Sequence, residues 1–139
     1  MVDALSEIRR ALAPGGCLID LRPLGGSWPV EVASALEIKE AGRAAELPAG
    51  VADDQAADQA MKHAAGRQWF RLERQEFFPF YYYWDSPGEM QEYIDREWED
   101  FLRVEESAWR NIRATWAVAD ADARVRIRLN MMIARWRKI

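Results

Sequence analysis

Residues 124–131 alternate strictly between polar and apolar side chains. The polar set is Arg124, Arg126, Arg128 and Asn130, and the apolar set is Val125, Ile127, Leu129 and Met131. Because successive side chains of a β-strand point to opposite faces, this pattern predicts a strand with one buried face and one face in water. Such a strand is typical of an antiparallel sheet. The arginines could bind an anion, or they could pair across strands with acids such as Glu37 or Glu73.

The N-terminal end predicts a helix followed by a second strand. Residues 3–13 carry apolar side chains at helical spacing. Pro14-Gly15-Gly16 ends that helix, because proline disfavours helix in the residue before it and glycine allows positive φ. The run from Cys17 to Leu21 is short and almost wholly apolar. It suits a strand covered on both faces, as parallel strands usually are.

The middle of the chain predicts further elements of both kinds. Strand-like residues at 30–39 are followed by Gly42, which favours a hairpin turn at 40–43. An alanine-rich pattern at 53–65 predicts a helix with a narrow apolar face.

An aromatic segment and two helices are expected after that. Residues 68–84 favour a strand, and Pro79 predicts an edge position, a bulge or a bend in it. Ser86-Pro87-Gly88-Glu89 matches a capping box, so Ser86 is expected to cap a helix that starts at Pro87. Another helix is expected over about 105–118.

Length and charge limit the class of protein. A chain of 139 residues fits one domain over 1–139, and its net charge of −4 gives no general attraction to nucleic acid or to an anionic membrane. No apolar stretch approaches the length of a membrane span. The lone Cys17 cannot form an intramolecular disulfide, which fits a reducing compartment. We therefore expect a cytoplasmic protein that binds neither nucleic acid nor membrane.

Arg10, Leu12 and Pro14-Gly15-Gly16 stand at the junction between the first helix and the Cys17 strand. This junction resembles one in class I S-adenosylmethionine-dependent methyltransferases, where a helix ending in Arg-x-Leu-(Lys/Arg)-Pro-Gly-Gly leads into the fifth strand. Ala13 replaces the usual basic residue. The resemblance implies an α/β fold: a partial Rossmann-like methyltransferase sheet, mixed and made of the C-terminal strands, with helices packed on it.

The resemblance also implies neighbours for the strand Cys17–Leu21. In the family this strand lies between an N-terminal strand and the C-terminal strand, which corresponds here to Val125–Met132. No part of the chain matches the N-terminal strand. The free edge and the uncovered apolar faces predict self-association, or binding of a partner that supplies the N-terminal methyltransferase half.

The family's cofactor site has no counterpart in this sequence. That site needs a glycine-rich turn after the first strand and an acid that binds the ribose hydroxyls. Gly15-Gly16 and Gly25-Gly26 do not follow a strand and open a helix, so neither pair replaces that turn. We expect no cofactor to bind this chain alone, and S-adenosylmethionine to bind only if a partner supplies the missing half.

No residue is assigned a catalytic, cofactor-binding or metal-binding role. The lone His63 and the lone Cys17 cannot build a zinc site, and we expect an exposed histidine and a buried structural cysteine. The aromatic residues that could form a wall for an acceptor substrate are Phe80, Tyr81, Tyr82, Tyr83 and Trp84. The alternative is that this strand is simply core, covered on both sides.

Three functions stay open at this point. The chain is a methyltransferase-related protein or fragment without cofactor binding or catalysis of its own, a subunit that completes a split methyltransferase, or a repurposed binding or dimerisation domain. Whether it is an enzyme is left open by the sequence, as is the identity of any acceptor substrate.

Overall fold

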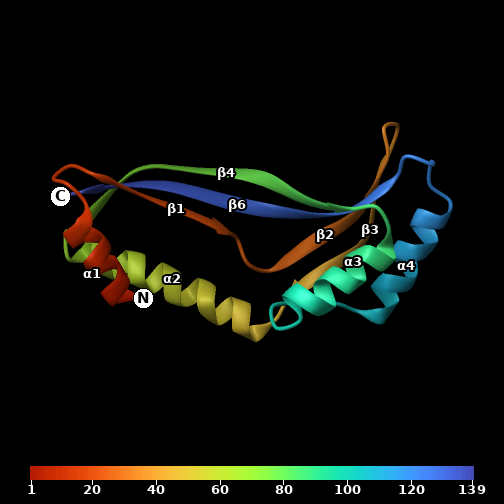
Figure 1. The fold of residues 1–139 in the computed structure, drawn as a ribbon, viewed down its shortest axis with the longest axis horizontal. Coiled ribbons are helices and arrows are strands. Elements are labelled where there is room, and N and C mark those ends of the chain that lie inside the picture. Colours follow the sequence, from red (N-terminus) through yellow and green to blue (C-terminus); the bar gives the residue numbers. More distant parts are fainter. The chain divides into compact units, whose positions relative to one another are not determined.

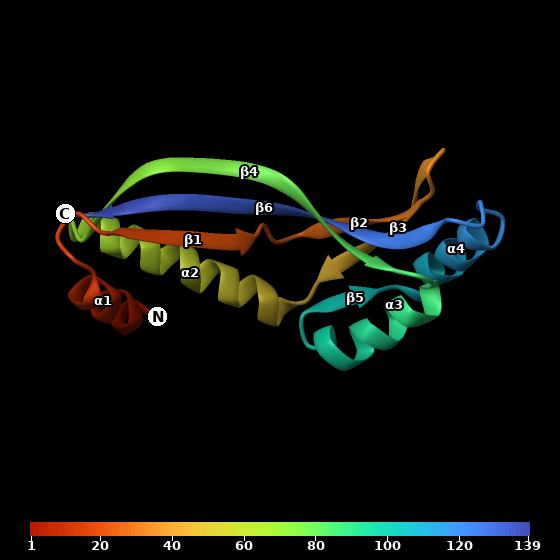
Figure 2. The same ribbon diagram turned by 45° about the horizontal axis from the view of Figure 1, so that its top comes forward.

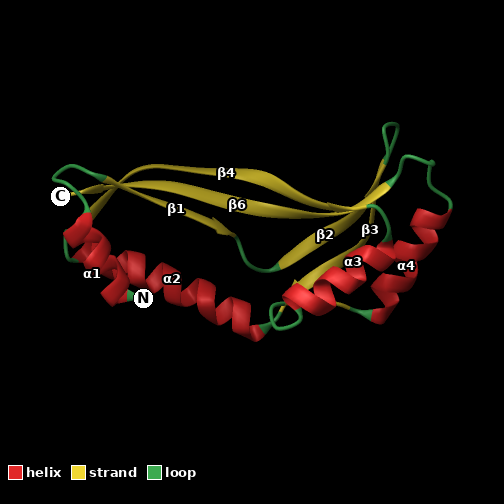
Figure 3. Cartoon of the chain, in the orientation of Figure 1, coloured by secondary structure: helices red, strands yellow, loops and turns green.

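A computed structural model describes all residues from Met1 to Ile139. The fold is α/β, with helices and an open antiparallel sheet of six strands (Figure 3). In chain order the elements are α1 (Val2–Ala11), β1 (Cys17–Pro23), β2 (Ser27–Ala33), β3 (Ile38–Glu46), α2 (Pro48–Gly66), β4 (Phe70–Trp84), α3 (Pro87–Tyr93), the π-helical η1 (Ile94–Trp98), β5 (Leu102–Val104), α4 (Glu106–Ala117) and β6 (Arg124–Lys138). A mixed sheet was expected, and this expectation is wrong because the strands pair antiparallel.

The residues fall into two compact units. The first contains Met1–Leu24, Ala52–Phe78 and Met131–Ile139, and the second contains Gly25–Val51 and Pro79–Asn130. Strands β4 and β6 contribute residues to both units. The interpretation of residues 1–139 as one domain stays a prediction.

In the first unit, β6 lies between β1 and β4, and α1 and α2 pack against one face of these strands (Figure 2). The buried core residues are Leu5, Ala60, Met61, Ala64 and Phe70, with Leu18 and Trp136 packed against them. Helix α1 ends at Ala11, two residues before the predicted end, because the backbone of Leu12 is already extended. Gly15 adopts a positive φ of 69°, so the Pro14-Gly15-Gly16 segment turns the chain into β1.

Strand β1 pairs with the C-terminal strand, as expected, but with a later part of it. Its register runs from Cys17 opposite Arg137 to Pro23 opposite Met131. The strand order places β1 at an end of the sheet, so its second edge has no strand partner. The expectation that β1 is covered on both faces is wrong, because Ile19 and Leu21 are 53% and 54% exposed. The helices cover only the face that carries Leu18.

In the second unit, β2 pairs with β3 on one side and with the start of β6 on the other (Figure 1). The hairpin turn lies at 34–37 instead of 40–43. Ser34 Oγ accepts hydrogen bonds from the backbone N–H groups of Leu36 and Glu37, and its hydroxyl lies 3.0 Å from Asp120 Oδ2. The turn is therefore stabilised by a serine side chain that binds the backbone of the turn, and not by a glycine.

Gly42 lies inside β3 for a different reason. Helix α4 packs against β3 at this point. A Cβ atom on residue 42 would lie 3.2 Å from Ala108 Cβ and 3.3 Å from Ile112 Cδ1. The missing side chain therefore allows a close approach of helix to strand and has no role in a turn.

The prediction for Ser86 is confirmed. Ser86 has extended backbone, and its Oγ accepts a hydrogen bond from Glu89 N at 3.2 Å. Glu89 Oε2 in turn accepts from the backbone N–H of Asp85 at 3.0 Å. The reciprocal bonds fix the start of α3 directly after β4.

Replacing Ser86 with alanine is expected to lower the free energy of unfolding by about 1 kcal/mol, because one N–H of the first helical turn loses its acceptor. Urea denaturation followed by circular dichroism measures this. Ser107→Ala in the first turn of α4 is the control, since Ser107 is exposed and caps nothing. An unchanged midpoint for Ser86→Ala would contradict the assignment.

Glu73 on β4 predicts a dependence of stability on pH. Its carboxylate accepts from Arg137 Nε at 2.8 Å and pairs with Arg135 Nε at 3.0 Å. The hydrogen bond from Arg137 is the main cause that lowers the pKa of Glu73 below its ordinary 4.5. The carboxylate therefore stabilises the folded chain above that pH.

As the pH falls below about 4.5, the unfolded chain takes up the proton first and this stabilisation is lost. Glu73→Gln should be less stable than the parent at pH 7, and the difference should shrink on acidification. Denaturation midpoints at several pH values test this, with Glu76→Gln as the control because Glu76 pairs with Arg74 alone. A difference that stays constant with pH would refute the assignment.

Candidate functional site

The expected aromatic wall lies at the C-terminal end of β4, in the second unit. Rings two residues apart share a face: Tyr82 lies 5.3 Å from Phe80 and 6.2 Å from Trp84 between centroids, and Tyr81 lies 6.2 Å from Tyr83. Phe80 and Tyr83 are 43% and 41% exposed, so β4 is not a strand covered on both sides. It pairs with β6 alone and forms an edge.

One face of the wall is fixed by rings from the helices that follow it. Trp98 of η1 meets Tyr82 edge-on at 4.9 Å and Trp84 at 6.0 Å. Tyr93 of α3 lies 5.6 Å from Trp84 and 5.1 Å from Trp98. Edge-to-face contacts of this kind are attractive because the ring edge is positive and the ring face is negative. The cluster holds Tyr82 and Trp84 in place while Phe80 stays exposed.

The other face of the wall meets the arginine row of β6. The guanidinium carbon of Arg126 lies 4.2 Å from the centre of the Tyr81 ring, and Arg126 Nη1 lies 2.8 Å from the hydroxyl oxygen of Tyr83. Arg124 lies 5.1 Å from the Tyr83 ring and pairs with Asp85. Stacked cations of this type stabilise and orient aromatic rings.

Glu31 of β2 is the partner of Arg126, and the sequence alone did not single it out. Arg126 Nε donates to Glu31 Oε2 at 2.6 Å, and Arg128 Nε donates to Glu31 Oε1 at 3.1 Å. Only 8% of the Glu31 side chain and 11% of the Arg126 side chain are exposed. The sequence left two alternatives for the arginines, anion binding or pairing with acids, and the structure shows them paired with acids. Their partners are Glu31 and Asp85 instead of Glu37 and Glu73.

Arg126 is held in its charged form. Burial is the largest single influence on its pKa and lowers it, but the hydrogen bonds and charge interactions with Tyr83 and Glu31 together raise it by more, so the pKa is raised overall. The position of Glu31 opposite Arg126 follows from the β2–β6 register, which no local pattern reveals.

The remaining candidates do not join this group. His63 is exposed on α2, with its ring 5.9 Å from that of Trp69, and Cys17 is half-buried in β1. Both belong to the first unit. No group of three or more histidine, cysteine or acidic side chains is arranged to hold a metal ion.

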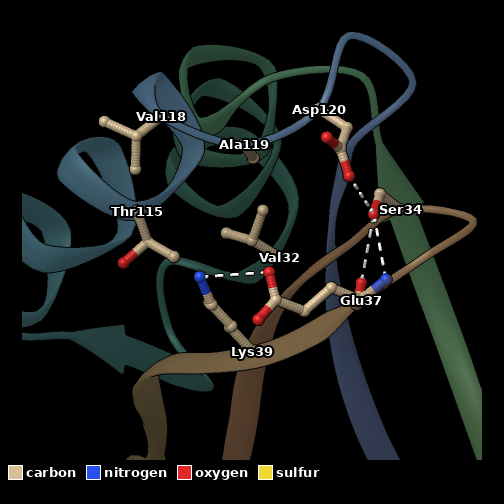
Figure 4. A pocket seen from close by; sticks show the side chains of 8 residues that line it. All are labelled: Val32, Ser34, Glu37, Lys39, Thr115, Val118, Ala119 and Asp120. Carbon is tan, nitrogen blue, oxygen red and sulfur yellow. Dashed lines mark hydrogen bonds and ion pairs between the residues drawn. The ribbon is translucent and has the colours of Figure 1, made fainter.

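A small hollow of about 50 Å³ lies beside the β2–β3 turn (Figure 4). Its lining residues are Val32, Ser34, Glu37, Lys39, Thr115, Val118, Ala119 and Asp120. Lys39 Nζ pairs with Glu37 Oε2 at 3.1 Å, and Ser34 bonds to Asp120 as described. Because its charged groups bind one another and it holds only a few water molecules, this hollow stabilises the turn and offers no ligand site.

No protein-family model, no curated protein and no solved structure matches this chain. None of its helices has both the length and the apolar character needed to cross a bilayer. The geometry of the aromatic wall indicates what the site can bind. Exposed rings backed by a fixed cation can bind an aromatic or apolar group.

Glu31→Ala tests the network behind the wall. It should lower the free energy of unfolding by about 3 kcal/mol, because Arg126 is left charged and buried without its carboxylate. Glu37→Ala removes an exposed pair with Lys39 and should cost less than about 1 kcal/mol. If chemical denaturation shows that both variants lose the same free energy of unfolding, the buried salt bridge of Glu31 does not stabilise the fold more than an exposed one.

Proposed function

We propose that this chain is a methyltransferase-related protein, corresponding to the C-terminal, acceptor-side part of a class I S-adenosylmethionine-dependent methyltransferase. On its own it neither binds the cofactor nor catalyses transfer. A partner chain with the N-terminal half would complete the cofactor site, in the cytoplasm. The aromatic wall Phe80–Trp84 would then face the acceptor substrate.

The pairing of β1 with β6 is the observation that carries this proposal. The strand that follows Pro14-Gly15-Gly16 lies next to the C-terminal strand of the chain, which is the neighbour that the resemblance implies. Its other edge is the place of the N-terminal strand in that family, and no strand of this chain occupies it.

The uncovered face of β1 supports the same proposal. Ile19 and Leu21 point to the face that α1 and α2 leave open. An apolar strand with a free edge and a free face is costly for an isolated chain and favours pairing with another chain. In a complete methyltransferase sheet, the N-terminal half would cover both.

Calorimetric titration of the chain with S-adenosylmethionine should show no binding. The ribose and the amino-acid part of the cofactor would lack most of their hydrogen-bond partners, and each missing bond costs on the order of 1 kcal/mol. A dissociation constant in the micromolar range would overturn the proposal that this chain is the part of the methyltransferase fold that lacks the cofactor site.

Sedimentation at micromolar concentration tests the free edge. The chain should self-associate, and Ile19→Lys should shift it towards monomer because a lysine on an edge strand hinders pairing. Leu36→Lys is the matched control, since Leu36 is 88% exposed in the β2–β3 turn, away from β1 in the sequence. A stable monomer with slow amide exchange across residues 17–21 would show that the edge is covered within the chain.

A further inference from the structure

A second hollow, of about 200 Å³, lies on the strands of the second unit. It is lined by Ser27, Trp28 and Pro29 of β2, Arg43 of β3, and Arg128 and Asn130 of β6. These side chains meet because β2 pairs with β3 and with β6, and Pro29 stands directly opposite Arg43. No acidic residue is among them.

Arg43 lines the hollow in a fixed position. Its Nε donates to Ser27 Oγ at 2.9 Å, its Nη2 to the Ser27 carbonyl oxygen at 2.7 Å, and its Nη1 to Glu40 at 2.8 Å. The Ser27 hydroxyl accepts from Arg43, so its own proton is left to donate elsewhere. The bonds order both side chains without a ligand, which lowers the entropy cost of binding one.

The guanidinium group of Arg128 is bonded through one of its three nitrogen atoms. Its Nε donates to Glu31 Oε1, while Nη1 and Nη2 form no bond within the chain, and 42% of its side chain is exposed. Glu31 already pairs with Arg126 through its other oxygen. One carboxylate is thus shared by two guanidinium groups, and a net positive charge remains beside the hollow.

Asn130 adds a neutral donor to this positive charge. Its side chain is exposed and forms no hydrogen bond within the chain. The hollow therefore presents guanidinium, amide and hydroxyl donors, and the acids that bind its two arginines, Glu31 and Glu40, are not among its lining residues. Guanidinium groups bind oxyanions through paired N–H groups, and a phosphate offers acceptor oxygens in several directions at once.

We propose that this hollow, formed by Ser27, Arg43, Arg128 and Asn130, is a binding site for a phosphate group. The group belongs either to inorganic phosphate or to a small phosphate ester whose organic part lies against Trp28 and Pro29. The site would bind phosphate whether or not the chain is part of a methyltransferase, because none of its donors belongs to the aromatic wall or to β1.

Titration of the ¹⁵N-labelled chain with inorganic phosphate at constant ionic strength tests the site. Amide signals of Ser27 and Arg43 and the side-chain amide of Asn130 should shift together and saturate. Asn130→Asp should weaken binding about tenfold, or about 1.4 kcal/mol, because it places a like charge in the hollow. Arg128→Gln should have a similar effect and still leaves a donor for Glu31.

Arg124→Gln is the matched control. It removes the same charge from the same strand, but Arg124 pairs with Asp85 and does not line the hollow. This variant should bind phosphate within about twofold of the parent. Equal weakening in Arg124→Gln and Arg128→Gln would overturn the site in favour of a diffuse charge effect, and so would the absence of saturable shifts in the folded parent chain.

A parallel titration with phenyl phosphate distinguishes the two sources of the group. Tighter binding than inorganic phosphate, with a shift of the Trp28 indole signal, would support an ester with an aromatic part. Equal affinity would support the free ion. Binding of acetate as tightly as phosphate would overturn the preference for phosphate.

Discussion

Strand β6 hydrogen-bonds to three other strands, and the placement of each functional group follows from this. Its first part pairs with β2, its last part pairs with β1, and β4 lies along it as well. The alternation at 124–131 gives the strand one buried face, and a shift of one residue in register would turn those apolar side chains into water. The buried Val125, Ile127 and Leu129 therefore fix which arginines meet Glu31 and which face Tyr81 and Tyr83.

Local signals in the sequence predicted the elements whose causes are local. The proline and glycines after α1, the capping box at Ser86 and the alternation of β6 all act within a few residues, and each is confirmed. The hairpin turn was misplaced because Gly42 is needed for packing against Ile112, which lies far away in the sequence. The apolar run of β1 predicts a strand covered on both faces, whereas its Ile19 and Leu21 are exposed. Composition reports how apolar a strand is, not what lies against it.

The candidate site shows the same division. The five aromatic residues of the wall and the arginine row were visible as patterns, because both use the period of two of a β-strand. The acid that joins them was not visible, since Glu31 is a single residue between two valines in β2. Its role depends on the register of β2 with β6 and on a bulge between Val30 and Glu31. Trp98 also joins the wall without a local signal, because it belongs to a π-helical turn that packs against Tyr82.

The arginine row also shows how one repeated residue acquires different roles from its neighbours. Arg124 faces an exposed Asp85, Arg126 is enclosed by Glu31 and two tyrosines, and Arg128 shares Glu31 and keeps its terminal nitrogens free. A salt bridge at the surface contributes little to stability, whereas a buried one fixes geometry at the cost of desolvation. Arg126 can therefore hold the aromatic wall but is not available to a ligand. Arg124 and Arg128 are each held through Nε by one carboxylate, but of the three arginines only Arg128 lines the hollow beside Ser27 and Arg43. Arg128 therefore has the fixed position next to other donors that a binding residue needs.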